Sequence, residues 1–352
     1  MDPALDNFFS VLGVSICIVG FFGNVSVLVA FFTHRGLRTK INAFLVSLAF
    51  SDLLLTGISM PLEVEWHIRS EFIHGVIVCE LIYTIHFLTL TSSSLNLFVI
   101  SVYRYLTIAY PFYMKRVTSL QVILVAIVVV WIYSGITALL PLLGWRSLPT
   151  STSDNYCYYS FDFDFALFVF ITNFLLPAVL VFVFYGLIFR IARIHAIKIL
   201  KSQVLSEYDR MCSPLLKGAK TLAKIAAVYL ICWFPYVIDV IVAMSGVPVP
   251  YLMHYTFVFL CYASAAINPF LYAGLCKDFR EVFRKWACKA CNWLSSVFRG
   301  LAYPSRRIVT SLCADRRKRT QRNAEGHCPS FRTRTTSGSS SVYHQQTVAT
   351  VV

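Results

Sequence analysis

Three polar side chains recur on one long apolar stretch, which runs from Cys79 to Pro111. His86, Ser93 and Arg104 are separated by seven and eleven residues. At 3.6 residues per turn, these spacings place them on nearly one stripe of a helix. A histidine there offers hydrogen bonds to a ligand, whereas a guanidinium stays charged and binds polar or anionic partners. The stripe must face protein or water, because an arginine exposed to lipid is costly.

The element that positions these side chains is a helix from Cys79 to Ala109, about 46 Å long at 1.5 Å per residue. That length exceeds the roughly 30 Å of a hydrocarbon core, so the helix is expected to cross a membrane with a tilt. It places His86 near one membrane surface and Arg104 near the other, about 27 Å apart.

The whole chain has the composition of a membrane protein. Of 352 residues, 57% are hydrophobic and only 14% are charged, and the mean hydropathy is +0.67. A water-soluble globule would not hide that much apolar surface. Seven apolar runs predict an all-α fold, a seven-transmembrane helix bundle. The runs are 8–32, 41–62, 76–109, 122–143, 165–189, 222–244 and 251–275.

Charge sets the predicted orientation and domain limits. Arg35, Arg38 and Lys40 follow the first run, which predicts cytoplasmic odd loops and an extracellular amino terminus in the plasma membrane. The net charge is +14, and residues 277–352 hold fifteen Lys and Arg against four acids. Such a tail suits anionic membrane lipids better than nucleic acid, because the protein is polytopic. We divide the chain into an extracellular amino terminus (1–7), the bundle (8–275), an amphipathic membrane-surface helix (276–292) and a disordered, basic, Ser/Thr-rich cytoplasmic tail (293–352).

Two cysteine pairs have predicted roles. Cys79 and Cys157 both fall at the predicted outer face, where a disulfide would pin the loop to the third helix, and two free thiols are the alternative. Cys288 and Cys291 close the amphipathic helix and are predicted palmitoylation sites.

A buried acid and three prolines mark the predicted helices. Asp52 lies inside the second run, and an ionisable group at that depth is a functional-site hypothesis by default. The alternative is a carboxylate hydrogen-bonded to Asn24 and Asn268 for packing. Prolines 177, 235 and 269 predict kinks in the last three helices.

Taken together, these residues resemble the rhodopsin-like (class A) G-protein-coupled receptors from Gly23 to about Cys291. The matching positions are Asn24, Asp52, Cys79, Arg104, Trp131, Cys157, Pro177, Trp233, Pro235 and the NPFLY sequence at 268–272. The resemblance implies a bundle that binds an agonist from outside and opens its inner end to a heterotrimeric G protein. Arrestin and a receptor kinase are further implied partners. A weaker resemblance, in the LLGW sequence and the aromatic pair after Cys157, is to adenosine receptors.

The resemblance also implies roles for individual residues. The coupling switch comprises Tyr103, Arg104, Tyr105, Tyr185, Pro235, Asn268, Pro269 and Tyr272. Arg104 would meet the G protein, and Trp233 would relay the ligand's position to the Pro235 kink. An allosteric sodium ion would bind at Asp52, Ser93 and Asn268, with Thr89 and Ser264 as additional donors.

Some positions depart from the family pattern. The family usually has an acid directly before the arginine, and this chain has Tyr103 there. Residues 214–216, before the sixth run, include no acid either. Because a buried arginine needs an anionic partner to hold it in the closed form, we predict raised basal activity. The alternative is that Tyr103 is only a hydroxyl partner to the backbone. Ser94 and Tyr229 also replace an apolar pair that the family packs beside Pro177.

The predicted ligand-binding residues are mostly aromatic. They are His86, Phe87, Leu90, Tyr159, Asn173, Trp233, Tyr236, Val258 and Tyr262. The only charges expected nearby are a titratable His86 and Asp239 toward the rim, which favours a small, mostly neutral, stacking or lipid-like ligand. His86 stands where aminergic receptors carry an Asp, and Tyr262 where opsins carry the lysine that binds retinal.

Other ligands and functions are weighed against this interpretation. A nucleoside ligand is one alternative, and a peptide held by Glu63, Glu65, Asp162 and Asp164 is another, although these acids are also typical of a solvated rim. No enzyme motif is present. A polytopic ion-coupled transporter is the rival class, because buried acids and broken helices also mark ion pathways. The ending at Val352 predicts a PDZ partner, and residues 333–341 predict phosphorylation.

Overall fold

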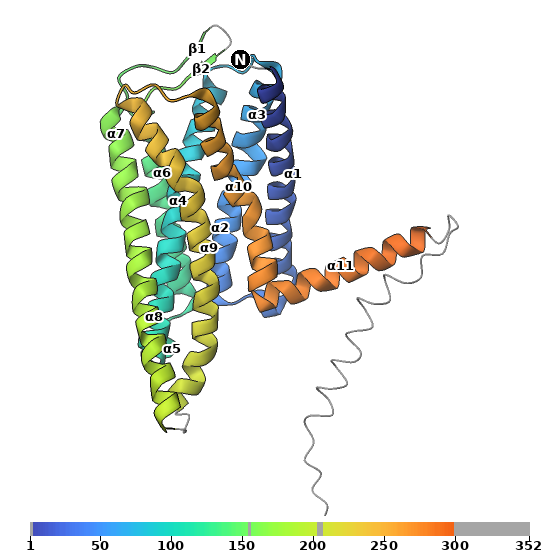
Figure 1. Cartoon of the computed structure of the whole chain (residues 1–352), viewed down its shortest axis with the longest axis vertical. Coiled ribbons are helices and arrows are strands. Elements are labelled where there is room, and N and C mark those ends of the chain that lie inside the picture. The colour runs from blue at the N-terminus through green and yellow to red at the C-terminus, as the bar shows by residue number, and fades with distance from the viewer. Residues whose placement is uncertain (1–2, 154–155, 203–206, 299–352) are drawn as a thin grey trace, which may run out of the picture. The chain divides into compact units, whose positions relative to one another are not determined.

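The computed structural model describes residues 3–153, 156–202 and 207–298. Within them, seven stretches are long and apolar enough to cross a membrane, and Figure 1 shows them side by side as a helix bundle. They span Asn7–Thr33, Lys40–Arg69, Val76–Ala109, Leu120–Leu139, Phe163–Ile194, Gly218–Met244 and Tyr251–Leu275. The prediction of an all-α, seven-helix membrane protein is confirmed. The chain falls into two compact units, residues 1–285 and 286–352.

The helices follow the apolar runs and end at local stop signals. In order, the elements are α1 (Pro3–Thr33), η1 (Arg35–Leu37), α2 (Lys40–Leu54), η2 (Leu55–Ser59), α3 (Met60–Arg69), α4 (Val76–Ala109), α5 (Pro111–Val117), α6 (Leu120–Leu139), β1 (Ser151–Ser153), β2 (Tyr156–Tyr158), α7 (Phe163–Phe168), η3 (Val169–Leu175), α8 (Leu176–Ser202), α9 (Glu207–Met244), α10 (Tyr251–Leu275) and α11 (Lys277–Phe298). Thr39 and Ser119 cap α2 and α6, because each side chain accepts a backbone N–H at 3.3 Å.

Two predicted boundaries differ from the structure. Helix α1 begins at Pro3, ahead of the first apolar run, although the stretch apolar enough to cross a membrane begins only at Asn7. The second span does not end at Leu62, because α3 continues to Arg69 and carries its acids within the helix. By contrast, α4 and α10 begin and end where the third and seventh apolar runs do.

Two π-helical turns interrupt the second and fifth spans, and each ends shortly before a proline. η2 (Leu55–Ser59) precedes Pro61, and η3 (Val169–Leu175) precedes Pro177. A proline ring clashes with the carbonyl four residues earlier and supplies no N–H, so a wider turn there relieves the clash. The two turns shift the register of α3 and α8 relative to a strict 3.6-residue period.

Helix α4 lies at the centre and contacts α2, α6, α8 and α9. Its middle carries buried hydroxyls that bond to neighbouring helices: Ser92 Oγ and Ser93 Oγ lie 2.8 and 3.0 Å from Ser51 Oγ of α2. Trp131 of α6 donates to Ser47 Oγ at 2.9 Å. Polar groups at membrane depth need such partners, because lipid offers none.

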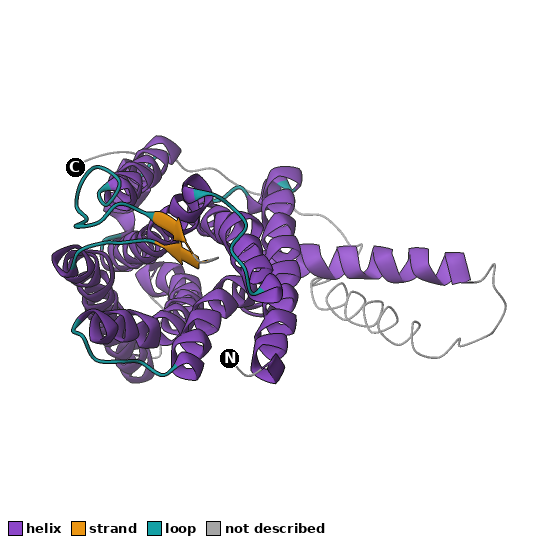
Figure 2. Cartoon of the chain, turned by 90° about the horizontal axis from the view of Figure 1, so that it is seen from above, coloured by secondary structure: helices purple, strands orange, loops and turns teal. Residues whose placement is uncertain are grey.

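A hairpin closes one end of the bundle. β1 and β2 pair antiparallel with Thr152 opposite Cys157, and Figure 2 shows the pair lying over the helix ends. The predicted disulfide is confirmed: Cys157 bonds Cys79 at the start of α4, with 5.7 Å between their Cα atoms. We call this the disulfide end and the opposite one, which holds Arg104, the arginine end.

The amphipathic helix after the bundle extends further than the predicted 276–292. α11 begins at Lys277 and ends at Phe298. In its first turns Phe279 is buried beside Tyr272, with 5.9 Å between ring centroids, while Asp278 and Arg280 are exposed. Of the predicted tail, the part from residue 299, with the Ser/Thr cluster at 333–341 and Val352, lies outside the described residues.

Candidate functional site

A cavity of about 280 Å³ opens inside the bundle at the disulfide end. Eight of the nine predicted ligand-binding residues line it: His86, Phe87, Leu90, Tyr159, Trp233, Tyr236, Val258 and Tyr262. Asn173 does not, and its predicted place in the wall is wrong. It is fully buried within η3, accepts from Tyr133 Oη at 2.8 Å and donates to Thr91 Oγ1 at 3.3 Å.

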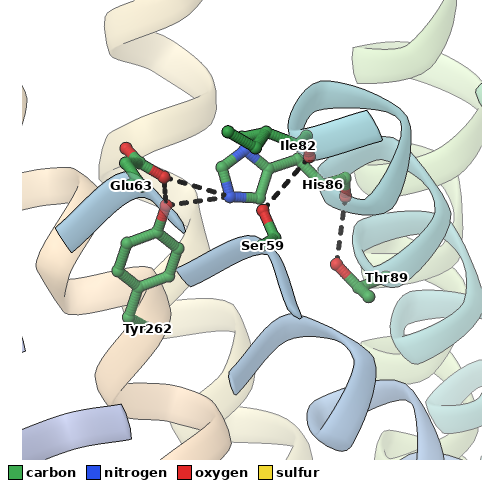
Figure 3. Close-up of polar contacts among 6 residues, drawn as sticks. All are labelled: Ser59, Glu63, Ile82, His86, Thr89 and Tyr262. Atoms are coloured by element: carbon green, nitrogen blue, oxygen red, sulfur yellow. Dashed lines mark hydrogen bonds and ion pairs between the residues drawn. The ribbon is translucent and has the colours of Figure 1, made fainter. Parts of the chain in front are cut away.

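A hydrogen-bonded group joins three helices at one wall of the cavity (Figure 3). The Tyr262 hydroxyl of α10 donates to Glu63 Oε2 of α3. His86 Nε2 of α4 lies 2.8 Å from the same hydroxyl oxygen and 3.5 Å from Glu63 Oε2. The backbone beside this group is held as well, since Thr89 Oγ1 donates to the His86 carbonyl at 3.1 Å.

Glu63 overturns the expectation that the cavity has no charge beyond His86 and Asp239. We placed it among rim acids because the apolar run ends at Leu62. The structure instead has Glu63 within the first turn of α3, with a side chain only 15% exposed. The cavity therefore contains a carboxylate, and the reason for expecting a mostly neutral ligand no longer holds.

Asp239, predicted toward the rim, is held by a histidine. Its side chain is fully buried, and Oδ2 lies 2.6 Å from Nδ1 of His254, which lines the cavity. Asp239 thus acts on the cavity through His254. His254 is a cavity residue that the sequence signals only by its place near the start of the last apolar run.

Aromatic rings form most of the remaining wall. Tyr83 and Tyr159 are stacked with centroids 4.7 Å apart, and Phe87 meets Phe161 edge-on at 5.4 Å. Burial raises the pKa of Tyr159 to about 12, with a smaller opposing effect from Arg146, so its hydroxyl is neutral at physiological pH. The wall offers flat apolar faces and neutral hydroxyls.

The cavity floor belongs to α9. Trp233 Nε1 donates to Ser264 Oγ of α10 at 3.1 Å, and Tyr229 Oη donates to the Leu90 carbonyl of α4 at 2.9 Å. These bonds attach α9 to both neighbours within two turns of Pro235. Tyr229 replaces an apolar residue of the family pattern, and the structure gives its hydroxyl a definite partner.

Below the floor, Asp52 is buried and its Oδ2 accepts from Asn268 Nδ2 at 2.8 Å. The expected bond from Asn24 is wrong, because Asn24 donates to the Gly20 and Ala265 carbonyls at 2.9 and 3.0 Å. Ser93 Oγ lies 3.0 Å from Ser51 Oγ, on the residue before Asp52. The carboxylate, the amide oxygen and nearby hydroxyls are the donors that a hard cation takes, so their chemistry fits a sodium ion.

At the arginine end, Arg104 packs against the backbone of α9. A methyl group built on Gly218 would lie 3.0 Å from Arg104 Nη2. Burial raises the pKa of the Cys276 thiol to about 11, and nearby Arg104 partly lowers it. In the part of the chain that the structure describes, no acid forms an ion pair with Arg104, and its Nε has no hydrogen-bond partner.

Among the described residues, no other predicted switch residue forms a hydrogen bond with Arg104, and Asn268 instead donates to Asp52. The Tyr185 and Tyr272 hydroxyls are buried and have no hydrogen-bond partner among the described residues. The ring centroid of Tyr103 lies 6.1 Å from that of Phe44, and the ring centroid of Tyr105 lies 5.5 Å from that of Phe184. Leaving a buried polar group unpaired costs about 1–3 kcal/mol, so a rearrangement that gave these hydroxyls partners would be favourable.

Comparison with known proteins agrees with this architecture. The family profile described as 7 transmembrane receptor (rhodopsin family) matches residues 23–272. The chain is 30% identical over 291 residues to the histamine H2 receptor of Canis lupus familiaris, covering 78% of each chain. It is 30% identical over 279 residues to the histamine H2 receptor of Homo sapiens, covering 77% of each. It is 25% identical over 310 residues to the alpha-1A adrenergic receptor of Oryzias latipes, covering 78% of this chain and 65% of that one.

Proposed function

Because the chain belongs to the rhodopsin family of seven-transmembrane, G-protein-coupled receptors, we propose that it takes up a small extracellular ligand in the cavity and answers by opening α9 around Arg104. The protein is a signalling receptor of the membrane and not an enzyme. Because the family consists of receptors, the alternative interpretation as an ion-coupled transporter is set aside.

One observation supports this function above the others: a single helix touches both sites. α9 supplies the cavity floor through Trp233 and packs its far end, at Gly218, against Arg104. Pro235 lies inside this helix and removes one backbone hydrogen bond, which makes a bend there inexpensive. A ligand that moves Trp233 therefore acts on the segment that covers the arginine.

The proposed orientation puts the disulfide end outside the cell. Disulfides persist in oxidising compartments, and Arg35, Arg38 and Lys40 lie at the opposite end of the bundle. The amino terminus is then extracellular in the plasma membrane, and Arg104 faces the cytoplasm, where heterotrimeric G proteins lie.

The cavity's size and aromatic wall favour a ligand of one or two rings. The named relatives are receptors for histamine and for adrenergic ligands, which are small molecules of this size. Nucleosides and lipids stay as alternatives. A peptide is less well supported, because Glu65 is paired with Arg69 at 2.7 Å and Asp162 accepts from Ser147.

The surroundings of Arg104 also support signalling in the absence of an agonist. In the described residues, no carboxylate holds Arg104 closed, so we propose that the receptor signals without an agonist. A sodium ion at Asp52, Ser93 and Asn268 would oppose opening.

Cys288 is half-buried and Cys291 exposed on α11, where palmitoylation is proposed. Arrestin, a receptor kinase and a PDZ protein are proposed partners of the tail.

Guanine-nucleotide exchange on purified G proteins, measured with the receptor in lipid nanodiscs, tests this function. Wild-type receptor should accelerate exchange, and Arg104→Ala should abolish the acceleration. Thr107→Ala is the matched control, because Thr107 lies in the same helical turn and bonds only the Arg104 carbonyl, at 2.9 Å. Full exchange with Arg104→Ala on every G protein tested would contradict the proposal.

A further inference from the structure

In the described part of the chain, only one of the two Glu63 carboxylate oxygens accepts a hydrogen bond. Oε2 accepts from Tyr262, whereas Oε1 makes no hydrogen bond among the described residues. The side chain is 15% exposed, and the residue lines the cavity. One carboxylate oxygen is thus available to whatever occupies the space.

The charge of this carboxylate is not needed to pair with His86. Tyr262 has one hydroxyl proton, which goes to Glu63, so His86 Nε2 must carry the hydrogen of the 2.8 Å bond to Tyr262 Oη. A neutral imidazole supplies that hydrogen. The direct separation of 3.5 Å between His86 Nε2 and Glu63 Oε2 exceeds a good hydrogen bond.

In the described part of the chain, the cavity wall supplies no lysine or arginine to balance Glu63, and the nearby His254 and Arg146 are already paired with acids. His254 is already paired with Asp239 at 2.6 Å. Arg146, on the loop after α6, is paired with Glu80 at 2.8 Å. A carboxylate at this depth without a cation is costly, and a bound cation would remove much of that cost.

The aromatic cavity walls are suited to contact the apolar body of an organic cation. Tyr83, Tyr159, Trp233 and Tyr236 line the same space, and aromatic faces attract ammonium groups. The volume of about 280 Å³ limits the ligand to a small molecule.

We infer that Glu63 binds the positive group of the ligand, and that this ligand is a small monocation, a protonated amine with an aromatic or apolar body. The inference rests on the proposed receptor function and names the ligand class for the same cavity. Helix α3 then supplies the counter-ion, while His86 of α4 and Tyr262 of α10 hold the carboxylate in place.

Matched ligand pairs test this inference in cells that carry a G-protein biosensor. The probes are 2-phenylethylamine, tryptamine and histamine, each beside the alcohol in which a hydroxyl replaces the amine. We expect at least one amine to change wild-type signalling at a concentration at least tenfold below its alcohol. Glu63→Gln should weaken that amine by roughly 10- to 100-fold and its alcohol by less than threefold.

Two further variants separate charge from folding. Glu63→Asp keeps the charge and should keep more amine potency than Glu63→Gln. Glu65→Gln, also on α3 but bonded to Arg69 and His74, should leave potency unchanged. The inference is overturned if no amine changes signalling, or if Glu63→Gln weakens amine and alcohol equally. Loss of agonist-free signalling in Arg104→Ala, measured in the same cells, would keep the receptor function standing in either case.

Discussion

The two ends of the bundle treat buried charge in opposite ways. At the disulfide end, Glu63 accepts from Tyr262, Asp239 pairs with His254, and both link different helices. At the arginine end, Arg104 faces the backbone at Gly218, and in the described part of the chain the Tyr185 and Tyr272 hydroxyls have no hydrogen-bond partner. Polar bonds therefore hold the buried charges around the cavity, whereas the Arg104 guanidinium packs against the backbone of α9. Helix α9 is still joined to α10 at this end, where Thr221 Oγ1 donates to the Leu275 carbonyl at 3.4 Å. Such a molecule can keep its ligand site intact while its inner end opens.

The largest expected effect comes from removing the covalent part of the disulfide end. Cys79→Ser breaks a bond between residues 78 apart in sequence and frees the hairpin from α4. Loss of a native disulfide typically costs about 2–5 kcal/mol, so most of the folded receptor should be lost from the cell surface. Surface labelling and thermal unfolding in detergent measure this.

Cys17→Ser is the matched control, because Cys17 is a half-buried cysteine of α1 with no disulfide. Equal surface levels for both variants would mean that the disulfide end does not depend on its covalent bond.

A second change gives the arginine end the ion pair that it lacks. Tyr103→Asp places a carboxylate next to Arg104, whose Nε has no partner among the described residues. If the pair contributes about 1–2 kcal/mol to the closed form, agonist-free signalling should fall by roughly 5- to 30-fold. Basal biosensor signal per receptor at the surface is the measurement.

Tyr103→Phe serves as the control, since it removes the hydroxyl without adding an acid. If Tyr103→Phe lowers the signal as much as Tyr103→Asp does, the hydroxyl and not the missing charge sets basal activity.

Tyr229 lies between the two ends and tests whether a hydrogen bond there holds α9 in the closed form. Its 2.9 Å bond to the Leu90 carbonyl joins α9 to α4 and must break when α9 moves outward. Tyr229→Phe removes about 1 kcal/mol from the closed form, so basal signalling should rise about fivefold. Tyr133→Phe also loses one hydrogen bond, to Asn173 at 2.8 Å, but not one from α9. A similar rise in both variants would count against a latch at Tyr229.

Most of the fold could be predicted from the sequence, because hydropathy determines which segments cross a membrane. α4 and α10 have the limits of their apolar runs, since each is uninterrupted and bounded by polar or turn residues. The second span extends beyond its apolar run, which ends at Leu62, because α3 continues through Glu63 and Glu65 to Arg69. A helix that continues through a proline needs the preceding turn to widen, and periodicity does not show that widening.

The candidate site could be predicted where helices are regular. His86, Phe87 and Leu90 follow each other on α4, and all three line the cavity. Asn173 lies within the π turn η3, which rotates side chains away from a 3.6-residue count, whereas Glu63 lies beyond the end of its apolar run and hydropathy alone does not place it in a helix. The predictions for these two residues therefore fail where a π turn or the loss of apolar character hides the course of the helix.

The smallest expected effect probes how loosely the arginine end is packed. Gly218→Ala adds a methyl group 3.0 Å from Nη2 and 3.2 Å from Nη1 of Arg104. An arginine without an ion pair shifts by a few tenths of an ångström at little cost, so basal signalling should rise about twofold or less. In the Tyr103→Asp background the guanidinium is held, and the same methyl group should raise the signal several-fold, a non-additive result. Gly186→Ala on α8 is the control, because its methyl group would meet nothing within 4 Å and brings the same gain in helix propensity. If Gly218→Ala has equal effects in both backgrounds, Arg104 is fixed in the wild-type receptor, and the contrast between the two ends fails.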